Sequence, residues 1–282
     1  MTTTNVLLKR EWWPDGETVL YSDGTKHRTG DHALLESMDL KVTDYCDMGC
    51  AFCHEMSTVK GKHAKLEDVI SIFEDESRVY AHVLEIAVGG GNPMDWEPMI
   101  DFLDYCEGRY IVNATVNQNH LIRYALSSKW PNPVHILSRF KGLGISVTDI
   151  ESLPLVLNMH EHSVAHVIAG VHSFETIRAV VGMSDRTLIL GYKTFGRGIK
   201  YKDDDVLLNI QTLKMNLRSL LGKEEKVVAF DNLGIEQLRP DRFIKDWNSI
   251  YMGDDGIHSC YIDAVAMKQY KSSFDRSEEV SI

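Results

Sequence analysis

The residues best suited to chemistry are three cysteines in one short stretch. Cys46, Cys50 and Cys53 occur in the order Cys-Asp-Met-Gly-Cys-Ala-Phe-Cys. Three thiolates on one tight loop can each bind a different iron of a cubane iron–sulfur cluster, and the fourth iron then has no protein thiolate. Such an iron is open to a small chelating molecule, as the open position of a catalytic zinc site is. The spacing therefore predicts a cluster that also binds a ligand.

Two other uses of these cysteines remain open. A zinc knuckle would combine them with His54 or His63, although zinc sites more often contain paired Cys-x2-Cys or His-x3-5-His ligands and the sequence has no second pair. An electron-carrying cluster would normally use a fourth cysteine, and Cys106 and Cys260 are distant in sequence. Cys106 lies on an apolar helical face and is predicted to be a small core residue.

The hydrophobic pattern predicts a scaffold of alternating strands and helices. Seven short apolar or β-branched runs indicate strands at residues 39–43, 83–88, 111–116, 143–148, 165–171, 187–192 and 226–230. Amphipathic segments lie between them; Asp95 is a candidate N-cap of the second helix and Gly222 a stop signal for a later one. This alternation favours parallel strands closed wholly or partly into a barrel, with functional groups in the loops after the strands.

Both ends of the chain are predicted to add β-structure. The turn signals Pro14-Asp15-Gly16 and Asp23-Gly24 indicate a β-meander over Val6 to Arg28. The turn signal Asp255-Gly256 precedes a strand-like run from His258 to Val265, which is expected to cover one open edge of the sheet. The expected organisation is an N-terminal extension at residues 1–35, a barrel at 36–250 and a C-terminal hairpin and tail at 251–282.

The composition is that of an ordinary globular protein. Of 282 residues, 44% are hydrophobic and 25% are charged, which excludes a disordered or fibrous class. The formal net charge of −11 opposes non-specific binding to nucleic acid or to an anionic membrane. No run approaches the roughly 18 apolar residues of a membrane span, and Met1 to Arg10 lacks a signal-peptide core. The number of cysteines is odd and three of them lie within eight residues, which suits a reducing compartment better than a disulfide framework. Together these features predict a cytoplasmic location.

The cysteine loop, with an aromatic residue before its last cysteine and a strand before its first, resembles the radical S-adenosylmethionine (SAM) superfamily. The resemblance covers roughly Met38 to Tyr192. It implies an α/β fold of the partial TIM-like (β/α)6 type and a [4Fe-4S] cluster held by Cys46, Cys50 and Cys53. It also implies an enzyme that reductively cleaves SAM to a 5′-deoxyadenosyl radical, which abstracts hydrogen from a substrate.

The resemblance also implies a SAM site along the strand ends. Gly90-Gly91-Asn92-Pro93 resembles the Gly-Gly-Glu-Pro motif that holds the SAM amino group, with Asn92 where the family has Glu. The amide oxygen of Asn92 can accept a hydrogen bond but carries no charge. The other residues that this likeness suggests for SAM are Asn117, Ser146, Gly170 and Lys193.

Several further residues have two interpretations. Asn119 is a helix cap or a polar strand end, and Lys193 and Arg197 lie in a loop that either pairs with an anionic group or is solvated. His166 and His172 flank the fifth strand and are packed histidines or substrate contacts. Positions after a barrel strand also make Asp231 and Asn232 candidates for substrate binding. Cys260 is either a packed strand residue or a donor of hydrogen to a product radical.

The motifs leave the reaction subclass open, because isomerisation, epimerisation, dehydrogenation and radical addition share the same first step. The shortage of cysteines for an auxiliary cluster favours a small metabolite, a nucleotide or a modified nucleobase over a peptide. An external electron donor such as flavodoxin or ferredoxin is implied. The alternatives are a zinc-stapled binding protein and a cluster-bearing electron carrier without SAM chemistry.

Overall fold

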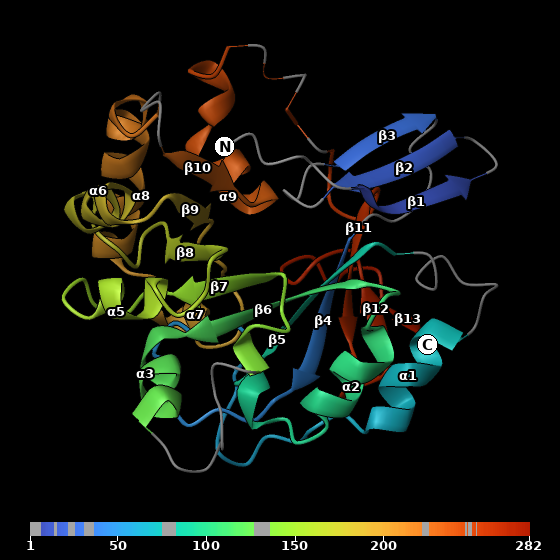
Figure 1. Ribbon diagram of the computed structural model, residues 1–282. Coiled ribbons are helices and arrows are strands. Elements are labelled where there is room, and N and C mark those ends of the chain that lie inside the picture. Colours follow the sequence, from blue (N-terminus) through green and yellow to red (C-terminus); the bar gives the residue numbers. More distant parts are fainter. Residues whose placement is uncertain are drawn as a thin grey trace.

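The computed structural model describes residues 7–13, 16–21, 26–30, 37–74, 83–126, 136–221, 226–245, 247, 250–251 and 253–282, with side chains from residue 37 onward. Seven parallel strands form its centre, and each pairs with the next in chain order (Figure 1). They are β4 (Ser37–Thr43), β5 (Glu85–Gly90), β6 (Ile111–Asn117), β7 (Gly142–Ser146), β8 (Ser163–Ile168), β9 (Arg186–Leu190) and β10 (Val227–Phe230). All seven predicted strands are therefore confirmed.

Helices follow the strands and lie on the outside of the sheet (Figure 1). They are α1 (Leu66–Glu74), α2 (Met99–Cys106), α3 (Gln118–Leu126), α5 (Leu153–Leu157), α6 (Phe174–Met183), α7 (Gly198–Tyr201), α8 (Asp204–Asn216) and α9 (Asn232–Leu238), with 3-10 turns η2 (Pro93–Asp95), η3 (Leu217–Ser219) and η4 (Pro240–Arg242). None of these described helices is long and apolar enough to cross a bilayer. The β-then-α order is the one that the hydrophobic pattern predicted.

The C-terminal segment extends the same sheet on the other side of β4. Strand β11 (Ser259–Asp263) pairs in parallel with β4, and β12 (Lys268–Tyr270) and β13 (Val280–Ser281) follow in antiparallel order. Gly256 has a φ of +82° in the preceding turn, a conformation that glycine adopts without strain. The prediction that this hairpin covers an open edge is confirmed. The described strands leave β10 and β13 as edges, so the barrel is partial.

A separate antiparallel sheet near the N-terminus consists of β1 (Leu7–Trp13), β2 (Gly16–Tyr21) and β3 (Lys26–Gly30). This is the predicted meander. Its turn residues Pro14, Asp15, Asp23 and Gly24 lie outside the described residues, as does Gly222.

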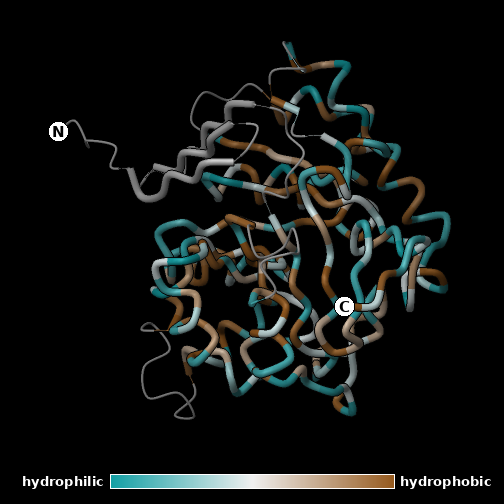
Figure 2. Tube along the Cα trace, turned by 90° about the vertical axis from the view of Figure 1, so that its right-hand side faces the viewer, coloured by the Kyte–Doolittle hydropathy of each residue, from teal (hydrophilic) through white to brown (hydrophobic). Residues whose placement is uncertain are grey.

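Alternation along each strand creates two different faces. In β6, Val112, Ala114 and Val116 are at most 4% exposed and join the core that packs against the helices. The residues between them face the inside of the curved sheet, because successive side chains of a strand point to opposite faces. Figure 2 shows hydrophobic and hydrophilic residues interspersed along the chain, with hydrophilic ones prominent in the outer loops. The core is therefore outside the strands, and the inside is left for polar groups.

The start of α2 differs from the prediction. Asp95 does not cap this helix but belongs to η2, and α2 begins at Met99 after Pro98. A proline suits the beginning of a helix because it has no backbone N–H to leave unpaired. On the faces of α2, Phe102 is completely buried and Ile100 is 40% exposed.

We expect Ile262→Ala to lower the free energy of unfolding by about 2 to 5 kcal/mol, because this fully buried side chain of β11 belongs to the core. Urea unfolding measures the change. Val280→Ala, at an exposed position of β13, is the control and should change the value by less than about 0.5 kcal/mol. Equal effects of the two substitutions would contradict the assignment of β11 to the core.

Candidate cofactor and substrate cavity

A cavity of about 920 Å³ occupies the inside of the curved sheet. Inward-facing side chains from all the strands between β4 and β10 line it, and the segment after β4 forms one of its walls. That segment carries Cys46, Cys50 and Cys53, and all three line the cavity. The structure thus brings the three predicted ligands together at the end of the strands where functional groups of barrels lie.

The cysteine loop turns back on itself through backbone hydrogen bonds. The N–H of Cys46 donates to the carbonyl of Thr58 (3.0 Å), and that of Cys53 donates to the carbonyl of Cys50 (3.2 Å). Gly49 has a φ of +64°, so the predicted tight turn between the ligands is present. Burial raises the pKa of the Cys46 and Cys50 thiols.

Arg197 braces this loop, a role that the sequence did not reveal. Its Nε donates to the carbonyl of Cys50 (2.8 Å), and both Nη atoms donate to the carbonyl of Ser57 (3.2 Å). Its backbone N–H also donates to the carbonyl of Cys53 (3.0 Å). A Cβ atom at Gly196 would lie only 2.5 Å from the carbonyl oxygen of His54. The guanidinium thus contacts the loop rather than extending toward an anionic ligand.

A second anchor lies at the other end of the loop. Asp47 accepts hydrogen bonds from both Nη atoms of Arg123 (2.7 and 2.8 Å) and contacts Nε2 of His120 at 2.8 Å. The hydrogen bonds from Arg123 lower the pKa of Asp47, and the contact with His120 lowers it by a smaller amount. Both partners belong to α3, so the residue beside the first cysteine is fixed to the helix that follows β6.

The glycine segment at the end of β5 lies directly against the chain before the cysteine loop. The N–H of Gly91 donates to the carbonyl of Thr43 (2.7 Å), and a Cβ atom at Gly91 would be 2.1 Å from the carbonyl oxygen of Tyr45. Gly90 has a φ of +118°. Both glycines line the cavity. Only residues without a side chain allow this close approach, so the two glycines let the end of β5 pack directly against the backbone of residues 43–45.

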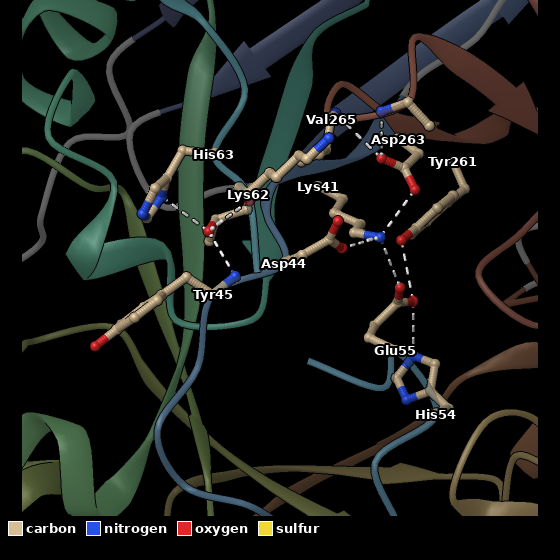
Figure 3. A network of polar contacts seen from close by, with 12 residues as sticks. Lys41, Asp44, Tyr45, His54, Glu55, Lys62, His63, Tyr261, Asp263 and Val265 are labelled. Carbon is tan, nitrogen blue, oxygen red and sulfur yellow. Dashed lines mark hydrogen bonds and ion pairs between the residues drawn. The ribbon is translucent and has the colours of Figure 1, made fainter. Parts of the chain in front are cut away.

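A buried ion cluster joins the loop to the C-terminal strand (Figure 3). The ammonium of Lys41 lies 2.6 Å from Asp44, 3.2 Å from Glu55 and 2.8 Å from Asp263. Burial disfavours its charge, but these carboxylates outweigh that effect and raise the pKa of Lys41. Glu55 also accepts a hydrogen bond from the hydroxyl of Tyr261 (3.0 Å) and pairs with Arg276. The cluster fixes the end of the cysteine loop between β4 and β11.

Asn117, Ser146 and Lys193, which were expected to bind SAM, also line the cavity. The side-chain oxygen of Asn117 accepts a hydrogen bond from the N–H of Asn119 (2.9 Å), so Asn117 rather than Asn119 caps α3. The ammonium of Lys193 donates to the hydroxyl of Ser273 in the C-terminal segment (2.7 Å).

Three predicted residues do not reach the cavity. Asn92 is 1% exposed, and its amide donates to the hydroxyl of Tyr124 and to Asp95, each at 2.8 Å. Gly170 has a φ of +89°, and a Cβ atom there would be 2.9 Å from Val206 of α8, so it serves helix packing.

Cys260 is the third of these residues. It is paired with Met38 on the outward face of β11 and lies in the core. Burial raises its pKa to about 12. The thiol therefore packs as a small hydrophobic group and does not face the position where a product would lie.

The cysteine loop has no grouping typical of a single-ion site. Among the described side chains, no three His, Cys, Asp or Glu residues are arranged to hold one metal ion together. The thiolates of a cubane cluster bind different irons and do not have to converge on one point. All five cysteines are described, and Cys106 and Cys260 are both buried in the core. The loop therefore offers three thiols and no fourth.

Comparison with known proteins adds evidence on the fold. No protein-family model and no curated protein matches the sequence. Crystal structures of SuiB from Streptococcus suis do match: the one bound to precursor peptide SuiA has a TM-score of 0.57 at 14% identity, and the one bound to S-adenosylmethionine has 0.55 at 13%. A third SuiB structure has a TM-score of 0.53 at 14% identity. The chain has the fold of SuiB.

In each comparison the match covers 85% of this chain and 60% of the SuiB chain. The present chain therefore corresponds to about three fifths of SuiB. At this identity the likeness concerns the fold, and it supports the α/β partial barrel that the sequence predicted.

We expect Lys41→Met to lower the free energy of unfolding by about 3 to 5 kcal/mol, because it leaves Glu55 and Asp263 buried without their central cation. Equilibrium urea unfolding tests this. Lys62→Met, at an exposed lysine near the same loop, is the matched control and should cost less than about 0.5 kcal/mol. If the two variants are equally stable, the ion cluster does not hold the loop.

Proposed function

We propose that the chain is a radical SAM enzyme. Cys46, Cys50 and Cys53 would hold a [4Fe-4S] cluster, and SAM would bind beside it in the cavity. The bound cluster supplies the electron that cleaves SAM reductively and so initiates hydrogen abstraction from a substrate. The chain's own residues would hold the cysteine loop in place, orient SAM and shield the cluster from water.

One observation carries this proposal: three thiols on one loop face the same cavity as a glycine segment, and no fourth thiol is near them. A cluster bound by three cysteines keeps one iron without a protein ligand. In this proposal the chelating molecule binds at that iron in the cavity that Gly90 and Gly91 also line, next to the loop. The fold likeness to SuiB, which was crystallised with S-adenosylmethionine, supports the same interpretation.

The surrounding residues have three tasks in this proposal. Arg197 and Asp47 hold the cysteine loop in place through its carbonyl groups and through α3. Phe52, whose ring contacts Tyr201 edge-on at 5.7 Å, covers the loop and excludes water from the cluster. Asn117 and Ser146 offer polar groups to the SAM nucleoside. Cys260 and Gly170 receive no role, because both are committed to packing.

The substrate in this proposal is a polar molecule that enters the cavity beyond SAM. The sequence favours a small metabolite, a nucleotide or a modified nucleobase. The likeness to a SuiB structure that contains a precursor peptide adds a peptide side chain as a second class. In both cases an external donor such as flavodoxin or ferredoxin supplies the electron.

We expect anaerobically reconstituted protein to be brown, to bleach with dithionite and to release 5′-deoxyadenosine from SAM. Cys50→Ala should abolish both the cluster and the cleavage, because two thiolates cannot hold the cubane. Iron analysis, visible absorbance and chromatography of 5′-deoxyadenosine are the measurements. Cys106→Ala, which removes a thiol from the core, is the control and should retain both properties. Cleavage by Cys50→Ala, or bound zinc in place of iron, would refute the proposal.

We expect Arg197→Ala to lose iron to a chelator about tenfold faster than the unmodified protein, because the substitution removes the charged donors that hold the Cys50 and Ser57 carbonyls. The loss of cluster absorbance over time gives the rate. Lys200→Ala, which removes an exposed cation from the same segment, is the matched control. Equal rates for the two variants would show that Arg197 does not brace the cluster loop.

A further inference from the structure

The cavity wall carries a carboxylate, that of Asp39, which no described residue pairs. On the inward face of β4, Lys41 neutralises Glu55 and Asp263 (Figure 3). Arg276 adds a second cation to that cluster through Glu55. Asp39 lies two residues earlier on the same face, and the surface it exposes is turned to the cavity. No described residue donates a hydrogen bond to it or forms an ion pair with it. Burial raises its pKa to about 6.

The surroundings of Asp39 add further negative charge. Asp231 accepts backbone hydrogen bonds from Gly191 (2.8 Å) and Gly234 (2.7 Å), and Asp255 accepts one from the amide of Asn232 (2.7 Å). Both carboxylates line the cavity and interact electrostatically with Asp39. The positive charge of Lys193 acts on Asp39, Asp231 and Asp255. Its ammonium is not within salt-bridge distance of these carboxylates and donates a hydrogen bond to Ser273. Among the described residues, Asp39, Asp231 and Asp255 therefore share the ammonium group of Lys193, and Glu85 adds a fourth carboxylate near Asp39.

The opposite wall adds a polar group without adding a positive charge. His166 of β8 is half-buried and lines the cavity, and no described residue forms a hydrogen bond with its ring. Burial lowers the pKa of His166, and the positive charge of Lys193 lowers it further, to about 4. The imidazole is therefore neutral near pH 7. A Cβ atom at Gly144 would lie 2.4 Å from this ring, so the absence of a side chain there makes room for it.

Alanines are among the residues that line the cavity. Ala87 is the strand neighbour of Asp39 in β5, and Ala229 of β10 also lines the cavity. Barrel interiors are usually filled by bulky branched side chains. Here a carboxylate and an imidazole that no described residue pairs face open space. A carboxylate without a partner attracts a ligand of opposite charge, and the attraction is stronger between the walls of a protein cavity than in bulk water.

We propose that this chamber binds a cationic nitrogen of the substrate, a primary amine or a guanidinium, with Asp39 as its direct partner and with Asp231 and Asp255 reinforcing the negative field. The inference rests on the proposed function only in assigning the amine to the substrate. It narrows the substrate to amine-bearing metabolites, or to peptides that insert a lysine or arginine side chain. His166 accepts a hydrogen bond from the same molecule on the opposite wall.

The test is isothermal titration of the full-length reconstituted protein with butane-1,4-diamine, at low ionic strength, with and without saturating SAM. Butane-1,4-diol is the neutral probe of the same length. We expect saturable binding of the diamine in both conditions and binding of the diol that is weaker by about tenfold or more. Asp39→Asn should weaken diamine binding by about tenfold or more. Asp205→Asn, the same substitution at an exposed position of α8, should leave it unchanged.

Several results would overturn the inference: no saturable diamine binding, equal binding of the diol, or an Asp39→Asn variant that binds as well as the unmodified protein. Displacement of the diamine by SAM would also overturn it, because the chamber would then be the site of the SAM amino group. Thermal unfolding of Asp39→Asn verifies that the variant is folded. Release of 5′-deoxyadenosine, measured on the same preparations, reports separately on the proposed function.

Discussion

The site depends on one buried ionic contact, that of Lys41 with Glu55 and Asp263. These residues come from β4, from the end of the cysteine loop and from β11, so the contact joins segments that are more than 200 positions apart in the chain. Burying three charged groups costs several kcal/mol each unless they are closely paired. The geometry of the loop is therefore tied to correct docking of the C-terminal strand, because any other arrangement leaves a buried charge unpaired.

A second constraint follows from the strands themselves. Alternating side chains send apolar residues outward to the helices and leave polar ones inside, as β6 shows with Val112 and Val116 outside and Asn113 and Asn117 inside. The core is thus built without filling the barrel. Because the cysteine loop, the glycine segment and Asp39 all face the resulting cavity, the proposed cofactor and a polar substrate would share one space. The proposed chemistry depends on that separation of core and cavity.

The sequence predicted most of what local patterns encode. The seven parallel strands follow from short apolar runs, and the three cysteines and Gly91 line one cavity because strand ends meet at one edge of a sheet. The role of Arg197 was not predictable, since it depends on contact between loops about 140 positions apart. The inward or outward direction of Cys260 depends on its register with β4. Gly170 is needed by a helix that packs on it later in the chain.

The unpaired state of Asp39 is also a property of three-dimensional packing. In sequence, Asp39 and Lys41 look alike as charged residues within one apolar strand. Only the fold shows that one of them is surrounded by partners and the other faces open space. For the same reason Asn92 could be matched to a motif by spacing, while its hydrogen bond to Tyr124 depended on α3.

The central claim is that three sulfur atoms hold a cluster with one iron free for SAM. Electron paramagnetic resonance of the dithionite-reduced protein tests it most directly, with spectra recorded before and after SAM is added. The account predicts a [4Fe-4S] signal that changes when SAM binds, because the cofactor becomes a ligand of the free iron. A cluster signal that SAM leaves unchanged, or a protein that binds zinc and gives no such signal, would contradict it.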